Sequence, residues 1–424
     1  MRPMLPTPKL ASRAASKAAS KAAFLAAAVT ICFGYVACGG SGNPGTGPSD
    51  DGDASSSGGD DAGGGGQGDA TSGSSSGSAS SSGSGSGSSS GSGSSSGTTS
   101  SSGSGSSSGG SFPVTTDVSI IVYPNGNHAA ELIAAINAAK TSVYMTMYEI
   151  DDSGVVKAIT SAKSRGLDVK VILDGSTTTR SNNQSAYGSF SGYVIWSSAV
   201  FTFTHEKCVM IDHATAWVMT ANAESSVPED NREYLAVDTN ATDVAEAESI
   251  FNADYGGKTV IPSGNLIVSP TNSRPDLVNL IASAQKSLDI EDEEFSDDNS
   301  NGITDAVVAA AKRGVAVRLV VAGGSTDSTQ TTALADVKAA PGASVYVSSV
   351  TSGSGSPSNP YIHAKAILVD CATGSCKAGF VGSENLTTGS LEYNREVGVI
   401  IEDATQLGTV LKAMNSDFAN ATKQ

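Results

Sequence analysis

Histidine, tryptophan and cysteine are scarce in this chain of 424 residues, which contains four histidines, two tryptophans and five cysteines. The cysteines form no Cys-x-x-Cys pair and no cluster with histidine, so the sequence suggests no zinc site, and we expect neither a metal nor another cofactor. Aromatic residues make up 5% of the chain. This composition excludes a collagen-like repeat, a coiled coil and a polytopic membrane protein.

Basic residues are also few, because 25 lysines and arginines face 42 aspartates and glutamates. Residues 112–424 alone carry 20 basic and 36 acidic side chains, a formal net charge of −16. Such a charge repels phosphate backbones at long range and argues against nucleic-acid binding by bulk charge. A local basic pocket remains compatible with it.

Large apolar side chains are almost absent from residues 39–111, a tract of glycine and serine. We expect this tract to be disordered and to act as a tether with an end-to-end distance of about 45–50 Å. Residues 1–38 have a basic start and then an apolar stretch, Ala22 to Val36, that is short for a membrane span. This pattern predicts an export signal.

The signal ends at Ala37-Cys38-Gly39, which resembles a bacterial lipoprotein processing site. We therefore expect diacylation of Cys38 and a lipid anchor in the cell envelope, with ordinary secretion and an uncleaved anchor as alternatives. Cys371 and Cys376 bracket a short turn. In an oxidising compartment they are expected to pair, although two free thiols remain the alternative.

The remaining 310 or so residues contain an internal repeat. The order strand, helix, strand, helix, strand is predicted at 118–123, 129–139, 142–147, 154–165 and 169–174, and again at 266–269, 276–285, 287–290, 303–313 and 315–321. Two α/β halves, 113–262 and 263–424, are thus predicted. We expect mostly parallel sheets flanked by helices, a pseudo-twofold relation and an active site at the interface.

Each half contains the pattern His-x-Lys-x4-Asp within an apolar run predicted to be a strand. The copies begin at His205 and His363, include Lys207 and Lys365, and end at Asp212 and Asp370. Residues i and i+2 of a strand share a face, so each histidine and its lysine should point the same way. The aspartates lie at an odd offset, which favours a structural role for them.

The repeat extends on both sides of these motifs. Downstream, Met219-Thr220-Ala221-Asn222 corresponds to Gly382-Ser383-Glu384-Asn385, and Glu233 corresponds to Glu396 within two Asn-Arg-Glu triplets. One five-residue insertion, which holds the two cysteines, explains the differing spacings. Upstream, Tyr148-Glu149 corresponds to Glu293-Glu294. Glu149 and Glu294 are candidates for pocket residues, with polar strand ends as the alternative.

These residues resemble the phospholipase D superfamily, whose hallmark is two His-x-Lys-x4-Asp motifs, each followed by Gly-Ser-x-Asn. The resemblance covers residues 113–424. The second copy is complete, whereas the first has Met219 in place of glycine and keeps a hydroxyl at Thr220. We expect Met219 to tighten that side of the pocket.

The resemblance implies a covalent phosphohistidine, which water hydrolyses or an alcohol intercepts in transphosphatidylation. By analogy, His205 is the nucleophile and His363 the general acid, with the reverse as alternative. The groups expected to clamp the phosphate without a metal are Lys207, Lys365, Asn222 and Asn385. Glu233 and Glu396 are expected to orient the imidazoles through the second ring nitrogen.

The sequence thus predicts an exported phosphodiesterase that acts on phospholipids or other phosphodiesters. Nucleic acid is less favoured because of the negative charge and the predicted membrane anchor. One alternative is a secreted endonuclease of the same superfamily. Another is a surface binding protein with a decayed site, which Met219 alone supports. Because one chain carries both motifs, no obligate oligomer is implied.

Overall fold

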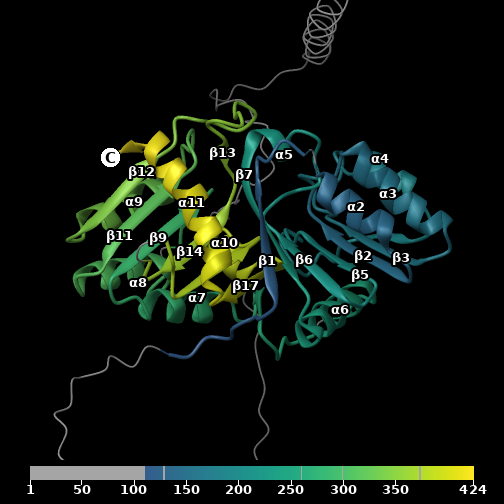
Figure 1. Ribbon diagram of the computed structural model, residues 1–424, viewed down its shortest axis with the longest axis horizontal. Helices are drawn as coiled ribbons and strands as arrows, with labels where there is room; N and C mark the ends of the chain where they lie inside the picture. Colours follow the sequence, from purple (N-terminus) through teal and green to yellow (C-terminus); the bar gives the residue numbers. More distant parts are fainter. Residues whose placement is uncertain (1–109, 128, 259, 298, 372–373) are drawn as a thin grey trace, which may run out of the picture. The chain divides into compact units, whose positions relative to one another are not determined.

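A computed structural model describes residues 110–127, 129–258, 260–297, 299–371 and 374–424. The predicted export signal, Cys38 and the Gly/Ser tract up to residue 109 lie outside the described residues. Two similar α/β halves lie side by side, with β1, β7 and β13 between them (Figure 1). The α/β class and the two similar halves are confirmed.

The first half contains a sheet with the strand order β1-β7-β6-β5-β2-β3-β4. Its elements are β1 (Val118–Tyr123), α2 (Ala130–Ala138), β2 (Ser142–Met147), α3 (Ser153–Ser164), β3 (Asp168–Leu173), α4 (Gln184–Ser189), β4 (Val194–Trp196), β5 (Cys208–Ile211), β6 (Thr215–Met219), α5 (Val227–Asp230), β7 (Asn231–Asp238) and α6 (Ala241–Tyr255). Strands β2, β3 and β4 run parallel to one another. The pairs from β1 through β7, β6 and β5 to β2 are antiparallel.

The second half repeats this plan in the strand order β18-β12-β11-β9-β14-β15-β17-β8. Its elements are β8 (Leu266–Ser269), α7 (Ser273–Ala282), β9 (Ser287–Asp292), β10 (Phe295–Ser296), α8 (Ile303–Lys312), β11 (Ala316–Val321), α9 (Ser328–Ala339), β12 (Ala343–Val347), β13 (Tyr361–Ile362), β14 (Lys365–Val369), β15 (Ala378–Gly382), β16 (Leu386–Thr387), α10 (Thr388–Glu392), β17 (Glu396–Ile401), α11 (Ala404–Asn420) and β18 (Thr422–Lys423). Strands β9, β11 and β12 are parallel, and β14, β15 and β17 are antiparallel. In each sheet the parallel strands alternate with helices, and the antiparallel strands carry the motifs.

Local sequence explains why the repeated helices begin and end where they do. The side chain of Asp152 caps α3 by accepting hydrogen bonds from the backbone N–H groups of Gly154 and Val155. Gly166 and Gly314 follow α3 and α8 at φ angles of 88° and 92°, a conformation that glycine adopts without steric cost. The two halves therefore end the corresponding helices by the same device.

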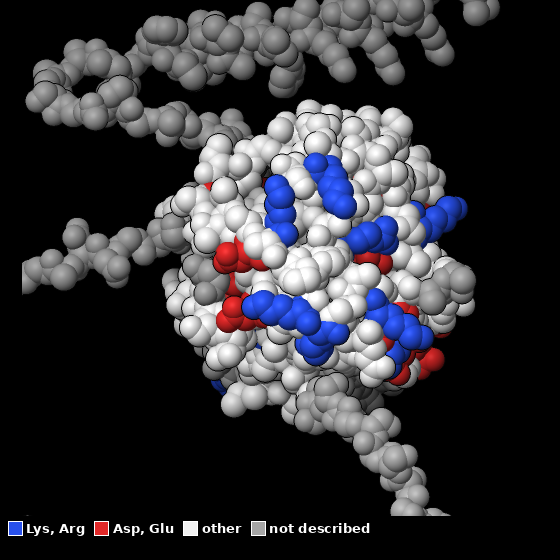
Figure 2. All heavy atoms as spheres, turned by 90° about the vertical axis from the view of Figure 1, so that its left-hand side faces the viewer, with Lys and Arg blue, Asp and Glu red and all other residues white. Residues whose placement is uncertain are grey.

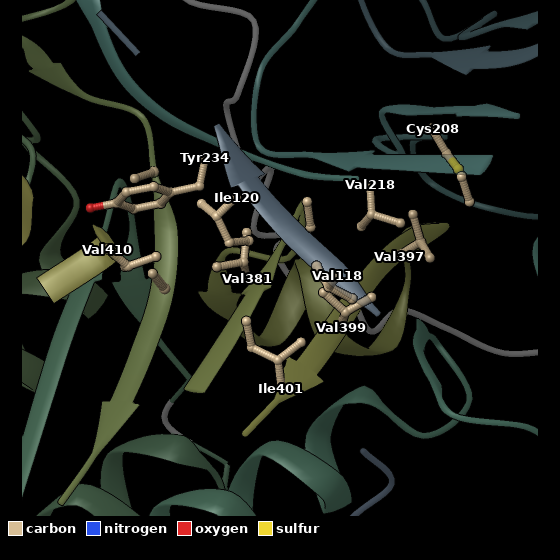
Figure 3. Packing of buried hydrophobic residues seen from close by; sticks show 14 of the residues in the cluster. Val118, Ile120, Cys208, Val218, Tyr234, Val381, Val397, Val399, Ile401 and Val410 are labelled. Carbon is tan, nitrogen blue, oxygen red and sulfur yellow. The ribbon is translucent and has the colours of Figure 1, made fainter. Parts of the chain in front are cut away.

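One hydrophobic core joins the two sheets. Figure 3 shows Val118 and Ile120 of β1 and Val218 of β6 packed with Val381 and Val399 of the second half. Each half also has its own core on the other face of its sheet, beneath its helices. Because a strand points successive side chains to opposite faces, each motif-bearing strand contributes to both cores.

Charge is unevenly distributed over the surface. Figure 2 shows the face at the left of Figure 1, over the second half, where lysine and arginine side chains lie among uncharged ones with fewer acidic side chains beside them. The net charge of −17 is therefore not a property of every face. Among the helices of the described residues, none has both the length and the apolar composition to cross a membrane.

Candidate active site

The sequence predicted that the two motif histidines lie within strands. In the structure both histidines lie just before their strands. His205 precedes β5, and His363 precedes β14. The reason is that the chain on the other side of each histidine pairs with the opposite half. Thr204 forms a β-bridge with Arg395, and β13 pairs with the start of β7. Each histidine therefore sits where the chain crosses the interface.

Each imidazole meets a glutamate from the opposite half. Glu396 Oε2 lies 2.7 Å from His205 Nδ1, and Glu233 Oε1 lies 2.8 Å from His363 Nδ1. All four side chains are buried. The motif spacing predicted that these glutamates orient the imidazoles, but it did not predict that the pairs would be crossed between the halves.

The surroundings of both glutamates favour the ionised carboxylate form. Burial alone would raise the pKa of Glu233, but the nearby His363 and Lys365 outweigh burial and hold that pKa below its usual value. The pKa of Glu396 is likewise lowered, because His205 and Lys207 outweigh the cost of burial. A carboxylate at Nδ1 fixes the proton on that nitrogen and leaves Nε2 of each ring for chemistry.

Hydroxyl groups hold the same two glutamates in place. Thr220 Oγ1 donates a hydrogen bond of 2.5 Å to Glu233, and Ser390 Oγ donates one of 2.6 Å to Glu396. Thr220 and its counterpart Ser383 each accept a hydrogen bond from the backbone N–H of the residue after the glutamate, but Ser383 donates to the backbone oxygen of Val397. The hydroxyl retained at Thr220 therefore acts on the glutamate that faces His363.

The two lysines are fully buried but differ in their contacts. Lys207 Nζ lies 2.6 Å from His205 Nε2, so the i, i+2 pair of the first half lies on one side of the chain. Lys365 Nζ donates to Glu293 Oε2 at 2.9 Å and to the backbone oxygen of His363 at 2.7 Å. The first lysine thus contacts its imidazole, and the second contacts a carboxylate beside its imidazole.

Glu293 is a site residue that the sequence reasoning missed. Its Oε1 accepts a 2.7 Å hydrogen bond from the hydroxyl of Tyr361, and its Oε2 lies 3.5 Å from His363 Nε2. Its counterpart in the repeat is Tyr148, whose ring stands edge-on to the His205 ring with centroids 4.6 Å apart. The alignment of Tyr148 with Glu293 was the available signal.

A cavity of about 50 Å³ opens beside His205. It is lined by Tyr148, Thr202, Phe203, His205, Glu294, Asn385, Thr387, Gly389, Ser390, Tyr393 and Asn394. The structure thus places Glu294 and Asn385 at His205, whereas Glu293 contacts His363. Glu293 and Glu294 are consecutive, so one short segment after β9 contributes a carboxyl group to the surroundings of each histidine.

The counterparts Asn222 and Glu149 lie in a second polar group. Asn222 donates to Glu224 at 3.0 Å, and Glu149 accepts a 2.8 Å hydrogen bond from Asn182. Burial, followed by the charge of Glu149, raises the pKa of Glu224 to about 7 although His363 lowers it. Within the described residues, Oδ1 of Asn222 and Oδ1 of Asn385 are buried without a hydrogen-bond partner.

Met219 lines a small cavity that Asn222 and Glu224 also line. It packs in the helix-side core of the first half with Trp217, whereas Val218 faces the shared core. Strand alternation explains this, because positions 217 and 219 point to the same face. At Gly382, by contrast, an added Cβ would lie 2.6 Å from the Cα of Gly398, so glycine is required there. Met219, the one sequence feature that favoured a decayed site, is not among the residues that line the cavity beside His205.

The motif aspartates lie away from the imidazoles. Asp212 accepts hydrogen bonds from the backbone N–H groups of residues 140–142, and Asp370 accepts them from residues 285–287. Both have positive φ angles, 57° and 52°. They join the turn after the motif strand to the start of β2 or β9. The insertion between β14 and β15 holds the disulfide between Cys371 and Cys376.

Two arginines, like the two glutamates, each form an ion pair with a residue of the opposite half. Arg232 contacts Asp417 of α11 at 2.5 Å, and Arg395 contacts Asp254 of α6 at 2.9 Å. Glu206 is buried beside the second pair, where burial and then the charge of Asp254 raise its pKa to about 8. Each Asn-Arg-Glu triplet thus uses two consecutive side chains to bind the opposite half.

The described residues contain no group of three or more histidine, cysteine, aspartate and glutamate side chains arranged to hold a metal ion. The polar groups of the site are instead two imidazoles, two ammonium groups, two amides and several carboxylates. Such a set can supply a nucleophile, a proton donor and cationic hydrogen-bond donors for a phosphoryl group.

Comparisons with known proteins agree with this site. The chain matches the family model of the cardiolipin synthase, PLD-like domain over residues 132–255 and 277–421. Cardiolipin synthase A of Pseudomonas aeruginosa is 29% identical over 132 residues, which are 29% of this chain and 26% of that protein. Cardiolipin synthase 1 of Bacillus cereus is 24% identical over 135 residues, 31% of this chain and 26% of that protein. The chain therefore spans about a quarter of the length of these curated relatives.

Solved structures share the fold. The phosphatidylserine synthase of Haemophilus influenzae aligns with a TM-score of 0.53 and 13% identity over 74% of this chain and 88% of that one. The polyphosphate kinase of Porphyromonas gingivalis aligns with a TM-score of 0.54 and 16% identity over 71% of this chain and 47% of that one. At these identities the likeness concerns the fold alone. The paired motifs, the doubled fold and the family match show that the chain belongs to the phospholipase D superfamily.

Proposed function

We propose that the protein transfers the phosphatidyl group of a phospholipid to water or to an alcohol through a phosphohistidine on His205. The observation that carries this proposal is the pair of buried imidazoles, each with a carboxylate at Nδ1 and a lysine of its own motif beside it. A phosphodiester needs one nucleophilic nitrogen and one proton donor, and this arrangement offers both.

In the first step, Nε2 of His205 attacks phosphorus. A P–N bond forms, the P–O bond to the leaving alcohol breaks, and the leaving oxygen takes the proton of His363 Nε2. Lys207, Lys365 and the two asparagines bind the phosphoryl oxygens, and Glu396 stabilises the positive charge that develops on His205. In the second step, a water or alcohol oxygen attacks phosphorus, its proton passes to His363, and the P–N electron pair returns to His205.

A phospholipid substrate has support from the relatives, whose names give cardiolipin and phosphatidylserine as products. Both products arise when a phosphatidyl group is joined to a hydroxyl group, so an alcohol is a natural acceptor for this site. The net charge of −16 over residues 112–424 also disfavours a nucleic-acid backbone at long range.

The test is a substrate panel with the full chain in EDTA. We expect release of the headgroup from phosphatidylcholine or phosphatidylglycerol vesicles, or formation of a new phosphatidyl alcohol when glycerol is added. Both His205→Ala and His363→Ala should lose this activity, and quenching in alkaline detergent should trap the phosphatidyl group on the wild-type chain but not on His205→Ala.

The outcomes separate the alternatives. Cleavage of plasmid DNA without turnover of vesicles would replace the proposal by a nuclease. Full activity in both histidine variants would overturn the mechanism. A chain that turns over none of these substrates and forms no phosphohistidine would indicate a binding protein.

We also propose that the protein works from a membrane through lipidation of Cys38. The support is the sequence Ala37-Cys38-Gly39 at the end of an apolar stretch. Cells that express the full chain should incorporate an alkyne-labelled fatty acid into it, and Cys38→Ser should abolish the labelling. Equal labelling of the variant, or none of the wild type, would contradict this proposal.

A further inference from the structure

The two halves of the site are unequal at one pair of corresponding positions. Beside His205 stands the uncharged ring of Tyr148, with its centroid 4.6 Å from that of the imidazole. Beside His363 stands the carboxylate of Glu293, 3.5 Å from Nε2 and 5% exposed. The repeat therefore surrounds two similar imidazoles with different electrostatic environments.

The surroundings of His205 favour a neutral ring with a lone pair on Nε2. An ammonium group carries only N–H donors, so the 2.6 Å contact from Lys207 Nζ makes Nε2 the acceptor. The ring proton then lies on Nδ1 and points at Glu396, 2.7 Å away. This is the state that a nucleophilic imidazole requires.

The surroundings of His363 favour a ring with a proton on both nitrogens. Glu233 lies at Nδ1 and Glu293 at Nε2, so a carboxylate faces each nitrogen. Glu224, on the loop after β6, is close enough for His363 to influence its pKa. From the other elements, Lys365 donates both to Glu293 Oε2, the oxygen nearest His363 Nε2, and to the backbone oxygen of His363. Tyr361 donates its hydroxyl proton to Glu293 Oε1.

A second asymmetry acts in the same direction. Glu224 stands two residues after Asn222, and the corresponding residue two after Asn385 is the uncharged Thr387, which lines the cavity at His205. At these two corresponding positions the His363 side has a carboxyl group where the His205 side has a neutral group, and Glu294 is the carboxyl group that lines the cavity at His205. Opposite charge within about 4–6 Å favours the charged form of an ionisable group, and Glu293 lies 3.5 Å from His363 Nε2.

We propose that Glu293 is a positioning residue that keeps the proton on His363 Nε2 and so makes His363 the acid and His205 the nucleophile. This inference rests on the proposed function, and it assigns the two roles from contacts within this chain. As the leaving oxygen takes the proton from Nε2, His363 becomes neutral. It regains the proton from water or from the acceptor alcohol in the second step, and Glu293 then stabilises the imidazolium again.

A titration of the histidines tests the resting state without any substrate. With only four histidines in the chain, imidazole nitrogen-15 NMR spectra of the full protein can be assigned with His205→Ala and His363→Ala. Glu293→Gln keeps the size of the side chain and one accepting oxygen, and it removes the negative charge. We expect it to lower the pKa of His363 by about one to three units and to leave that of His205 nearly unchanged. Glu248→Gln, which removes a carboxylate at the surface beside His213, is the matched control for net charge.

Leaving-group dependence tests the catalytic consequence. A p-nitrophenyl phosphodiester expels an anion that needs no proton, whereas an alkyl phosphodiester needs the acid. Glu293→Gln should slow phosphohistidine formation from the alkyl ester at least tenfold at pH 8, with little effect on the p-nitrophenyl ester. The alkaline limb of the alkyl-ester rate should also move to lower pH.

The two proposals fail in different ways. An unchanged titration of His363 in Glu293→Gln, or equal slowing of both esters, would overturn the role of Glu293 even if the wild type is fully active. A wild type that cleaves neither ester would overturn the proposed function, and the titration would still decide whether Glu293 holds the proton of His363.

Discussion

Replacing Glu396 by glutamine tests the crossed pairing most directly. The carboxylate oxygen lies 2.7 Å from His205 Nδ1, and the two side chains are 0% and 4% exposed. When Nε2 attacks phosphorus, the ring becomes cationic, and a unit charge at this distance contributes roughly 6 kcal/mol at an effective dielectric constant of about 20. Glutamine still accepts the hydrogen bond and the ring carries only part of its charge in the transition state, so we expect about half of this effect.

A loss of about 3 kcal/mol corresponds to a decrease of roughly 100-fold in the rate of phosphohistidine formation. Stopped-flow absorbance of the p-nitrophenolate released in a single turnover of a p-nitrophenyl phosphodiester measures this rate. Glu233→Gln acts on the opposite histidine, so with this leaving group it should be close to wild type. Glu402→Gln, an exposed residue of the second half, is the control. Equal losses in Glu396→Gln and Glu233→Gln, or a loss only in the latter, would refute the crossed assignment.

Three further outcomes are expected. Asp417→Asn leaves the buried Arg232 without its charged partner and should lower the free energy of unfolding by about 3–5 kcal/mol. Urea titrations measure this quantity, and a decrease below about 1 kcal/mol would show that the ion pair between the halves does not stabilise the fold. Because the pKa of Glu206 is raised to about 8 from 4.5, the folded state binds more protons than the unfolded state between these values. Stability should therefore fall as the pH rises through this window. Glu206→Gln should flatten that slope, and an unaltered slope would show that Glu206 is not the group responsible. Replacing Cys371 and Cys376 by serine opens a short loop between β14 and β15 and should lower the free energy of unfolding by roughly 2 kcal/mol. Phosphodiester turnover should not change, and a loss of turnover would show that this loop supports the site.

The repeat could be read from the sequence because both copies preserve local signals. Helix ends before Gly166 and Gly314, and apolar runs after His205 and His363, require only neighbouring residues to be recognised. These local signals gave the order of strands and helices, and helix boundaries were correct to within about three residues. They also led to one error, because the apolar run was extended back to each histidine.

The crossed contacts could not be read in this way. The partner of His205 lies 191 residues away in Glu396, and nothing near either residue indicates which half it faces. The chemistry of Glu293 depends likewise on its distance from His363, although its alignment with Tyr148 was visible. Met219 packs in the helix-side core, as strand alternation requires, and the motif spacing alone did not indicate this environment.

The crossing of the two Asn-Arg-Glu triplets has a consequence for how such a protein can evolve. A separate half would lack the glutamate that orients its own histidine, so only a pair of copies could form a complete site. In a symmetric pair every substitution appears on both sides, and the acid and the nucleophile would have to share one environment. Joining the copies in one polypeptide removes that constraint. One copy can then acquire a glutamate at position 293 while the other keeps a tyrosine at position 148, which allows a division of labour that identical subunits cannot encode.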